Sequence, residues 1–242
     1  MRLALRHAAA MTLELVRYPA YLVPTILFPS VFFLFFTAPG AHQSATMRMA
    51  TFAGFASIGV AFFQFGVGIA VDRASPWETY LRTLPIGPSV RLGARLMSAA
   101  VFAFAASGLL IVVALSSTDA ALTAPAWLGL AVALLGGTVP FALLGIALGY
   151  WAPARGALPI ANLLYLGLSY AGGLWVRPGS LPGAVAAVSP YLPTRALSDA
   201  LAAAATGAAS PWRSWVALGA FAAVFAWLAA WGYRRDEGRR FR

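Results

Sequence analysis

Residues 18–39 read YPAYLVPTILFPSVFFLFFTAP, and residues 49–71 read MATFAGFASIGVAFFQFGVGIAV. The runs are 22 and 23 residues long, and neither contains a charged side chain. A transmembrane helix needs about 20 consecutive apolar residues, so each run is long enough to cross a bilayer. These two runs predict an all-α membrane protein rather than a soluble domain.

The same pattern recurs along the chain. Four further uncharged runs of about span length cover residues 97–116, 126–150, 157–176 and 214–233. The composition agrees, because 61% of the 242 residues are hydrophobic, 10% are charged and the mean hydropathy is +0.78. Soluble domains are about a quarter charged. We therefore expect six transmembrane helices in one transmembrane domain, residues 1–242.

The basic residues predict the orientation, and all 17 of them are arginines. If both termini are cytoplasmic, 13 lie inside, including those of a basic tail at residues 234–242. The outer four are Arg48, Arg177, Arg195 and Arg213. Such an excess is the positive-inside pattern. We expect a multi-pass protein of a plasma membrane, that is, of the bacterial inner or cytoplasmic membrane. The net charge of +10 then sets the topology, and we expect no binding of nucleic acid.

Residues 1–17 are expected to form an amphipathic lead-in helix along the membrane. One stripe of this helix carries the charged residues Arg6, Glu14 and Arg17. Another stripe carries the apolar residues Leu5, Leu13 and Val16. An ordinary helical lead into the first span is the alternative.

The loop at residues 72–88 is expected to be cytoplasmic and to contain a short helix. Ser75, Pro76 and Glu78 form a helix start, with serine as the N-cap, proline at the first position and glutamate closing a capping box. Pro85 ends the helix. A short amphipathic helix can lie on lipid headgroups or dock into a groove of a soluble partner, and the pattern leaves both open. Its apolar residues follow one helical face: Trp77, Tyr80, Leu81 and Leu84.

The loop resembles a known family. The run from Asp72-Arg73 to Glu78-Thr79-Tyr80-Leu81-Arg82-Thr83-Leu84-Pro85-Ile86 is similar to the signature of type-two ABC exporter permeases, although relatives usually carry Gly-Thr at Ser75-Pro76-Trp77. In that family this loop is the coupling helix that meets the ATP-binding subunit. The resemblance therefore implies an ATPase contact made by Arg73, Trp77, Glu78, Tyr80, Leu81, Arg82 and Leu84.

Residues 177–212 are too apolar for a solvated loop and too long for a turn. We expect short re-entrant helices that dip into the outer leaflet before the last span, one of them capped by Thr194 and running from Arg195 to about Ala205, near Gly207. The same family has such a region, and the similar pieces here are Gly172-Gly173, Pro178, Ser189-Pro190-Tyr191-Leu192-Pro193 and Leu197-Ser198-Asp199-Ala200-Leu201.

Several kinds of chemistry are disfavoured. The chain lacks lysine, so it has no P-loop and cannot itself be a P-loop ATPase. His7 and His42 fall on opposite sides of the membrane in this topology, which excludes an intramembrane site with both as metal ligands. None of the six runs contains an ionisable acid or histidine for catalysis or proton coupling. We expect no enzyme activity, metal or cofactor in this chain, with ATP and Mg²⁺ bound by a partner ATPase.

The spans contain few polar side chains, and four of them are candidates for a translocation path: Gln64, Asn162, Ser169 and Tyr170. Hydrogen bonding between helices is the favoured alternative role for Gln64 and Asn162, at about 0.6 kcal/mol per contact. The phenylalanines at 28, 32, 33, 35 and 36 are more typical of lipid-facing or interfacial positions than of a drug pocket. An apolar, aromatic cavity would suit hydrophobic or amphipathic cargo.

The resemblance implies the membrane-spanning permease subunit of an ATP-driven ABC exporter of drug, antibiotic or lipid-like cargo. Its partners would be two ATP-binding subunits, a second permease chain in a homodimer or related heterodimer, and membrane lipid. Spans two and five would line the path. The alternatives are a membrane scaffold or assembly protein without transport activity, an exporter of a polysaccharide or other polar cargo, and a membrane-embedded lipid-modifying enzyme.

Overall fold

The computed structural model describes residues 2–36, 44–76, 88–209 and 211–240. Every regular element within these residues is a helix, which confirms the all-α expectation. The elements are α1 (Arg2–Val16), α2 (Pro19–Phe36), α3 (Ala45–Ala61), the π-helix η1 (Phe62–Val67), α4 (Gly68–Ala74), α6 (Pro88–Ser117), α7 (Ala124–Trp151), α8 (Ala154–Ala171), η2 (Pro178–Ser180), α9 (Gly183–Val188), η3 (Ser189–Tyr191), α10 (Pro193–Thr206) and α11 (Trp212–Arg240).

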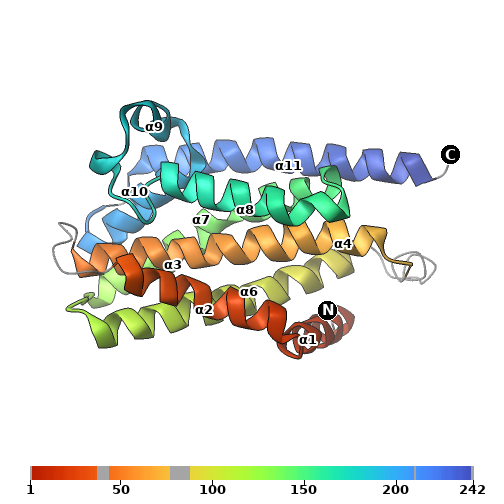
Figure 1. Ribbon diagram of the computed structural model, residues 1–242, viewed down its shortest axis with the longest axis horizontal. Helices are drawn as coiled ribbons and strands as arrows, with labels where there is room; N and C mark the ends of the chain where they lie inside the picture. The colour runs from red at the N-terminus through yellow and green to blue at the C-terminus, as the bar shows by residue number, and fades with distance from the viewer. Residues whose placement is uncertain (1, 37–43, 77–87, 210, 241–242) are drawn as a thin grey trace.

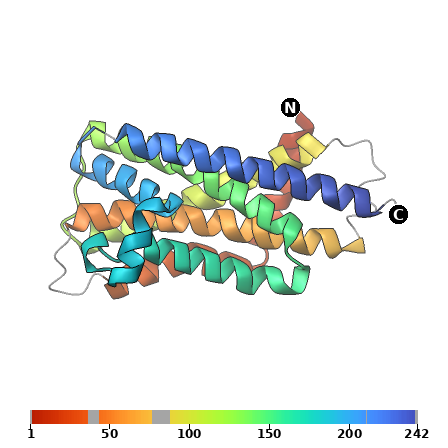
Figure 2. The same ribbon diagram turned by 90° about the horizontal axis from the view of Figure 1, so that it is seen from above.

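The long helices lie side by side in one elongated bundle (Figures 1 and 2). Both chain termini lie at the end of the bundle where α4 ends, and α9 and α10 lie at the opposite end (Figure 1). We call these the loop end and the far end. The arginine distribution predicts that the loop end faces the cytoplasm.

Five helices among the described residues are long and apolar enough to cross a membrane: 19–36, 45–74, 90–117, 124–151 and 212–237. Helix α8, which contains most of the predicted span 157–176, is not one of them. It has 18 residues and includes Arg155 and Asn162, which lower its hydropathy. It ends at Ala171, because Gly173 turns the chain at a φ of +79° that glycine readily adopts. The count of six spans remains a prediction.

The second predicted span forms the centre of the bundle. Helices α3 and α4 are joined by η1 into one continuous run, Ala45–Ala74. In its most apolar stretch of 18 residues, 78% of the residues are buried. The corresponding share is 17% for both α2 and α11. The outer helices therefore present most of their apolar surface to the surroundings, as expected of helices in lipid.

Helix α10 fills the far end of the bundle. It runs from Pro193 to Thr206 and ends at Gly207 with a φ of +68°, close to the helix expected from the sequence. The predicted cap is wrong: Leu192 is the N-cap, because Pro193 already takes the first helical position. The Thr194 hydroxyl instead donates to the carbonyl of Leu168 in α8, at 2.6 Å. Whether α9 and α10 enter the outer leaflet remains a prediction.

Candidate functional site at the loop end and in the second span

The loop that resembles a coupling helix leaves the bundle at the end of α4. Six of its predicted contact residues lie outside the described residues: Trp77, Glu78, Tyr80, Leu81, Arg82 and Leu84. Ser75, the predicted N-cap, has the extended backbone typical of a capping residue, with φ −81° and ψ 136°. The coupling helix itself remains a prediction, and the structure defines the base from which it starts.

Arg73 fastens this base to the bundle. Its Nη1 donates to the carbonyls of Gly149 and Tyr150 at the end of α7, at 2.7 and 2.9 Å. Its Nη2 pairs with Oδ1 of Asp236 in α11 at 2.5 Å, and its guanidinium lies 5.5 Å from the centre of the Tyr150 ring. The last carbonyls of a helix lack partners within the helix and favour a nearby cation. Arg73 therefore joins α4 to α7 and α11. Its predicted contact with an ATPase is untested.

A second arginine joins the two helices that flank the loop, α4 and α6. Nη2 of Arg95, in α6, forms a short ion pair with Oδ2 of Asp72 in α4. Nη1 of Arg95 donates to the backbone carbonyl of Gln64 at 2.9 Å. The Arg95 side chain is only 13% exposed. Asp72 and Arg95 are 23 positions apart, and no local sequence pattern connects them, so their pairing was not predicted.

Gln64 lies inside η1 and is buried. Its Nε2 donates to Oγ of Ser98 in α6 at 2.9 Å. This contact agrees with the favoured role, hydrogen bonding between helices. Its Oε1 is buried and has no hydrogen-bond partner. Ser57 and Ser107 form a similar contact between α3 and α6 nearer the far end, at 2.9 Å.

The other three candidate path residues lie on α8. Ser169 is fully buried and its Oγ has no hydrogen-bond partner, whereas Asn162 and Tyr170 are partly buried. The Tyr170 ring lies 5.7 Å from that of Trp175. Among the described residues, no hydrogen bond connects any of these three side chains with Gln64. The structure thus places the four candidates on two helices without joining them into one polar site.

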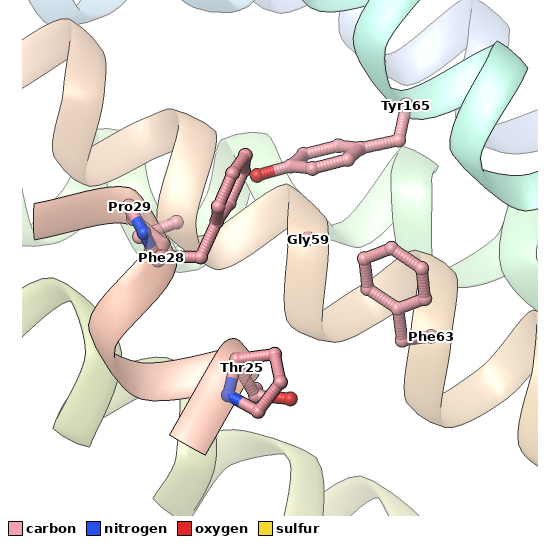
Figure 3. A pocket seen from close by; sticks show the side chains of 8 residues that line it. Thr25, Phe28, Pro29, Gly59, Phe63 and Tyr165 are labelled. Carbon is pink, nitrogen blue, oxygen red and sulfur yellow. The ribbon is translucent and has the colours of Figure 1, made fainter. Parts of the chain in front are cut away.

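A small hollow lies between α2, the central helix and α8 (Figure 3). Only about 20 Å³ of it is accessible to the centre of a water molecule, so it has room for about one water. Its lining residues are Pro24, Thr25, Phe28, Pro29, Ala56, Gly59, Phe63 and Tyr165.

Tyr165 forms one wall of the hollow and was missed by the sequence analysis. Its hydroxyl donates to the carbonyl of Phe55 at 3.1 Å, and the two rings are stacked at 4.5 Å. A Cβ at Gly59 would lie 2.9 Å from the Tyr165 hydroxyl, so the glycine allows this close approach. A tyrosine inside an apolar run was the available signal.

The phenylalanines of α2 differ in their surroundings. Phe33 is fully buried and Phe35 is 76% exposed. Phe32 belongs to an aromatic cluster. The centre of its ring lies 4.8 Å from that of Trp175 and 5.6 Å from that of Phe55. The lipid-facing interpretation therefore fits Phe35 and does not fit Phe33 or Phe32. Phenylalanines in a helix where nearly every position is apolar do not reveal from the sequence which of its faces is covered by other helices.

Comparisons with known proteins give one informative result. No protein-family model matches the chain, and no solved structure matches it significantly. A protein of Bacillus subtilis (strain 168) named "Putative transport permease YvfS" is 21% identical over 230 residues, which cover 93% of this chain and 94% of that protein. The chain is thus a membrane protein similar over nearly its whole length to a transport permease, and its long apolar helices fit a membrane transport permease.

Proposed function

We propose that this chain is the membrane-spanning subunit of an ATP-driven exporter that moves hydrophobic or amphipathic cargo out of the cytoplasm or the inner leaflet. Two ATP-binding subunits, which bind ATP and Mg²⁺, and a second permease chain complete the transporter. This chain is not itself the P-loop ATPase, because it has no lysine for a P-loop. Both of its termini face the cytoplasm of a bacterial plasma membrane.

The anchoring of the loop between α4 and α6 is the observation that carries this proposal. Asp72 and Arg95 connect the two helices that flank the loop, α4 and α6, and Arg73 fastens the end of α4 to α7 and to Asp236 of α11. A loop that is fixed to several helices can pass a displacement to them as rigid-body motion. A flexible tether would absorb the displacement. The anchoring therefore supports a role for this loop as the point where an ATPase drives the bundle.

The hollow between α2, α3, η1 and α8 has room for only about one water molecule and is not itself a cargo site, but its lining supports an apolar path between these helices. Its lining is almost entirely aromatic, aliphatic or proline, with Thr25 and Tyr165 as the polar exceptions. The Tyr165 hydroxyl is already bonded to a backbone carbonyl. Small-molecule sites are mostly apolar with few polar groups, whereas an anionic polymer would require basic side chains, and none lines this hollow.

The loop offers a direct test with a matched control. Trp77 and Leu81 lie on the predicted apolar face of the coupling helix, and Thr79 and Thr83 lie on its opposite face. We expect the variant W77D/L81D to lose co-purification with the proposed ATP-binding subunit, while T79D/T83D, with the same added charge, retains it. Membrane insertion of both variants is checked by protease protection. Equal retention of the ATP-binding subunit by both variants would refute the coupling role.

A further inference from the structure

The π-helical segment η1 interrupts the central span at the level where α6 and α7 meet it. The amide of Gly68, at its end, donates to the carbonyl of Phe63, five residues earlier, and to that of Phe65. In a regular α-helix this amide would donate to the carbonyl of Gln64, four residues earlier. Short π segments within α-helices frequently occur at functional sites. The carbonyl of Gln64 is therefore available to a donor from another helix.

Helix α7 supports this segment from one side by close backbone packing. A Cβ at Gly145 would lie 2.7 Å from the carbonyl oxygen of Ala61, and a Cβ at Gly149 would lie 2.8 Å from that of Phe65. Real Cβ atoms do not approach oxygen so closely. Both glycines thus allow the backbone of α7 to lie directly against the central helix, and this side of η1 has little room to move.

Arg95 of α6 holds the segment from the other side. It donates to the carbonyl of Gln64 within η1 and pairs with Asp72, which lies beyond η1 in α4. A Cβ at Gly68 would lie 2.6 Å from Nη1 of Arg95. Glycine at this position leaves space for the guanidinium. One side chain of α6 therefore connects the π segment itself with the helix that follows it, α4.

The Gln64 side chain leaves one polar atom of the π segment unsatisfied. Its Oε1 is buried without a hydrogen-bond partner, and such an atom destabilises the state that contains it. A change to regular α-helix would let the Gly68 amide take the Gln64 carbonyl in place of Arg95, and it would rotate the residues after η1 by about 100° relative to those before it. Arg95 opposes this change only while its guanidinium reaches both partners.

We propose that η1 is a hinge of the central span and that Arg95 is the positioning residue that holds it in the π form. Asp72 lies in the last turn of α4 and Arg95 lies about two turns into α6, so a displacement of the end of α4 relative to α6 withdraws Arg95 from Gln64. Loop movement is then converted into rotation of α4 against α3. The coupling of this hinge to ATP rests on the proposed function, but the hinge itself does not.

The chain contains no cysteine, so the hinge can be tested with single introduced thiols. Ala70 is 2% exposed and Val71 is 50% exposed. In the purified permease we expect Val71→Cys to react with N-ethylmaleimide at least ~10-fold faster than Ala70→Cys, since reaction follows thiol exposure. In the R95Q background, rotation of α4 should change this ratio by ~10-fold or more. The variant G68A, which displaces the guanidinium, should change it in the same direction.

Two controls make the outcome decisive. Arg91→Gln removes the same charge one turn earlier in α6, and it should leave the ratio within ~2-fold of the parent value. If R95Q does not fold, R95K is used, because a lysine keeps the charge but cannot supply the two-armed contact. An unchanged ratio in both folded Arg95 and Gly68 variants, or the same change in R91Q, would overturn the hinge.

The coupling step has its own readout. In vesicles that contain the ATP-binding subunit, R95Q should still retain that subunit but should lower ATP-dependent transport of the lipophilic dye rhodamine 6G by ~10-fold or more. Parent-level transport in R95Q would overturn the positioning role. If the parent chain retains no ATP-binding subunit, the proposed function fails, and the thiol ratios still decide the hinge independently.

Discussion

Replacement of Arg73 by glutamine should destabilise the bundle more than the loss of any surface arginine. The side chains of Arg73 and Asp236 are 20% and 8% exposed, and they pair at 2.5 Å. Removal of one partner from a buried ion pair typically costs about 3–5 kcal/mol. Arg73 also donates to two carbonyls at the end of α7. Because its side chain is partly exposed, we take the lower end of that range, about 3 kcal/mol.

Unfolding of the purified chain in mixed micelles with increasing SDS, followed by tryptophan fluorescence, measures this loss. The matched control is Arg195→Gln. Arg195 pairs with Asp199 at 2.8 Å within α10, but these side chains are 28% and 41% exposed. Exposed pairs of this kind contribute about 0.2–1 kcal/mol, so we expect R195Q to change the free energy of unfolding by less than about 1 kcal/mol.

A double-mutant cycle separates the pair from its surroundings. D236N alone and R73Q/D236N complete the cycle, and contacting residues in one network show coupling energies of about 0.5–3 kcal/mol. We expect a value in the upper half of that range. A coupling energy near zero, or an R73Q variant no less stable than R195Q, would refute the conclusion that Arg73 anchors the loop base.

Two further predictions concern the interior of the bundle. Gly172→Ala should destabilise the bundle by about 1–3 kcal/mol, because a Cβ there would lie 2.7 Å from the carbonyl carbon of Thr194. The control is Gly183→Ala, where nothing lies within 4 Å of the new Cβ. It should change the midpoint of the same SDS titration little. Tyr165→Phe keeps the stacked ring but loses the 3.1 Å hydrogen bond to Phe55, so it should cost about 1 kcal/mol; an unchanged midpoint would show that this bond contributes nothing.

The sequence predicted the features that follow from composition and local pattern. The uncharged runs predicted an all-helical membrane bundle, and Gly207 marked the end of α10 because glycine readily adopts a positive φ. The end of α8 at Ala171, before the end of the apolar run 157–176, was missed. Hydropathy alone does not register the Gly172-Gly173 turn that lets α10 approach α8.

The contacts that define the candidate site were not predictable in the same way. Arg73 and Asp236 are 163 positions apart, and Gln64 and Arg95 are 31 apart, so their pairing depends on how the helices pack. The π-helix η1 was also missed, because one additional residue in an apolar helix leaves no visible signal where both faces are buried. Asp236 within the basic run Arg234–Arg240 was the one local hint of a partner for a buried arginine.

Transport itself tests the central claim most directly. The measurement is uptake of rhodamine 6G into inside-out membrane vesicles that contain this chain and the proposed ATP-binding subunit. We predict ATP-dependent uptake with the parent chain and with T79D/T83D, and none with W77D/L81D or with a non-hydrolysable ATP analogue. Uptake by W77D/L81D equal to that of the parent, or equal uptake by vesicles with and without this chain, would contradict the account.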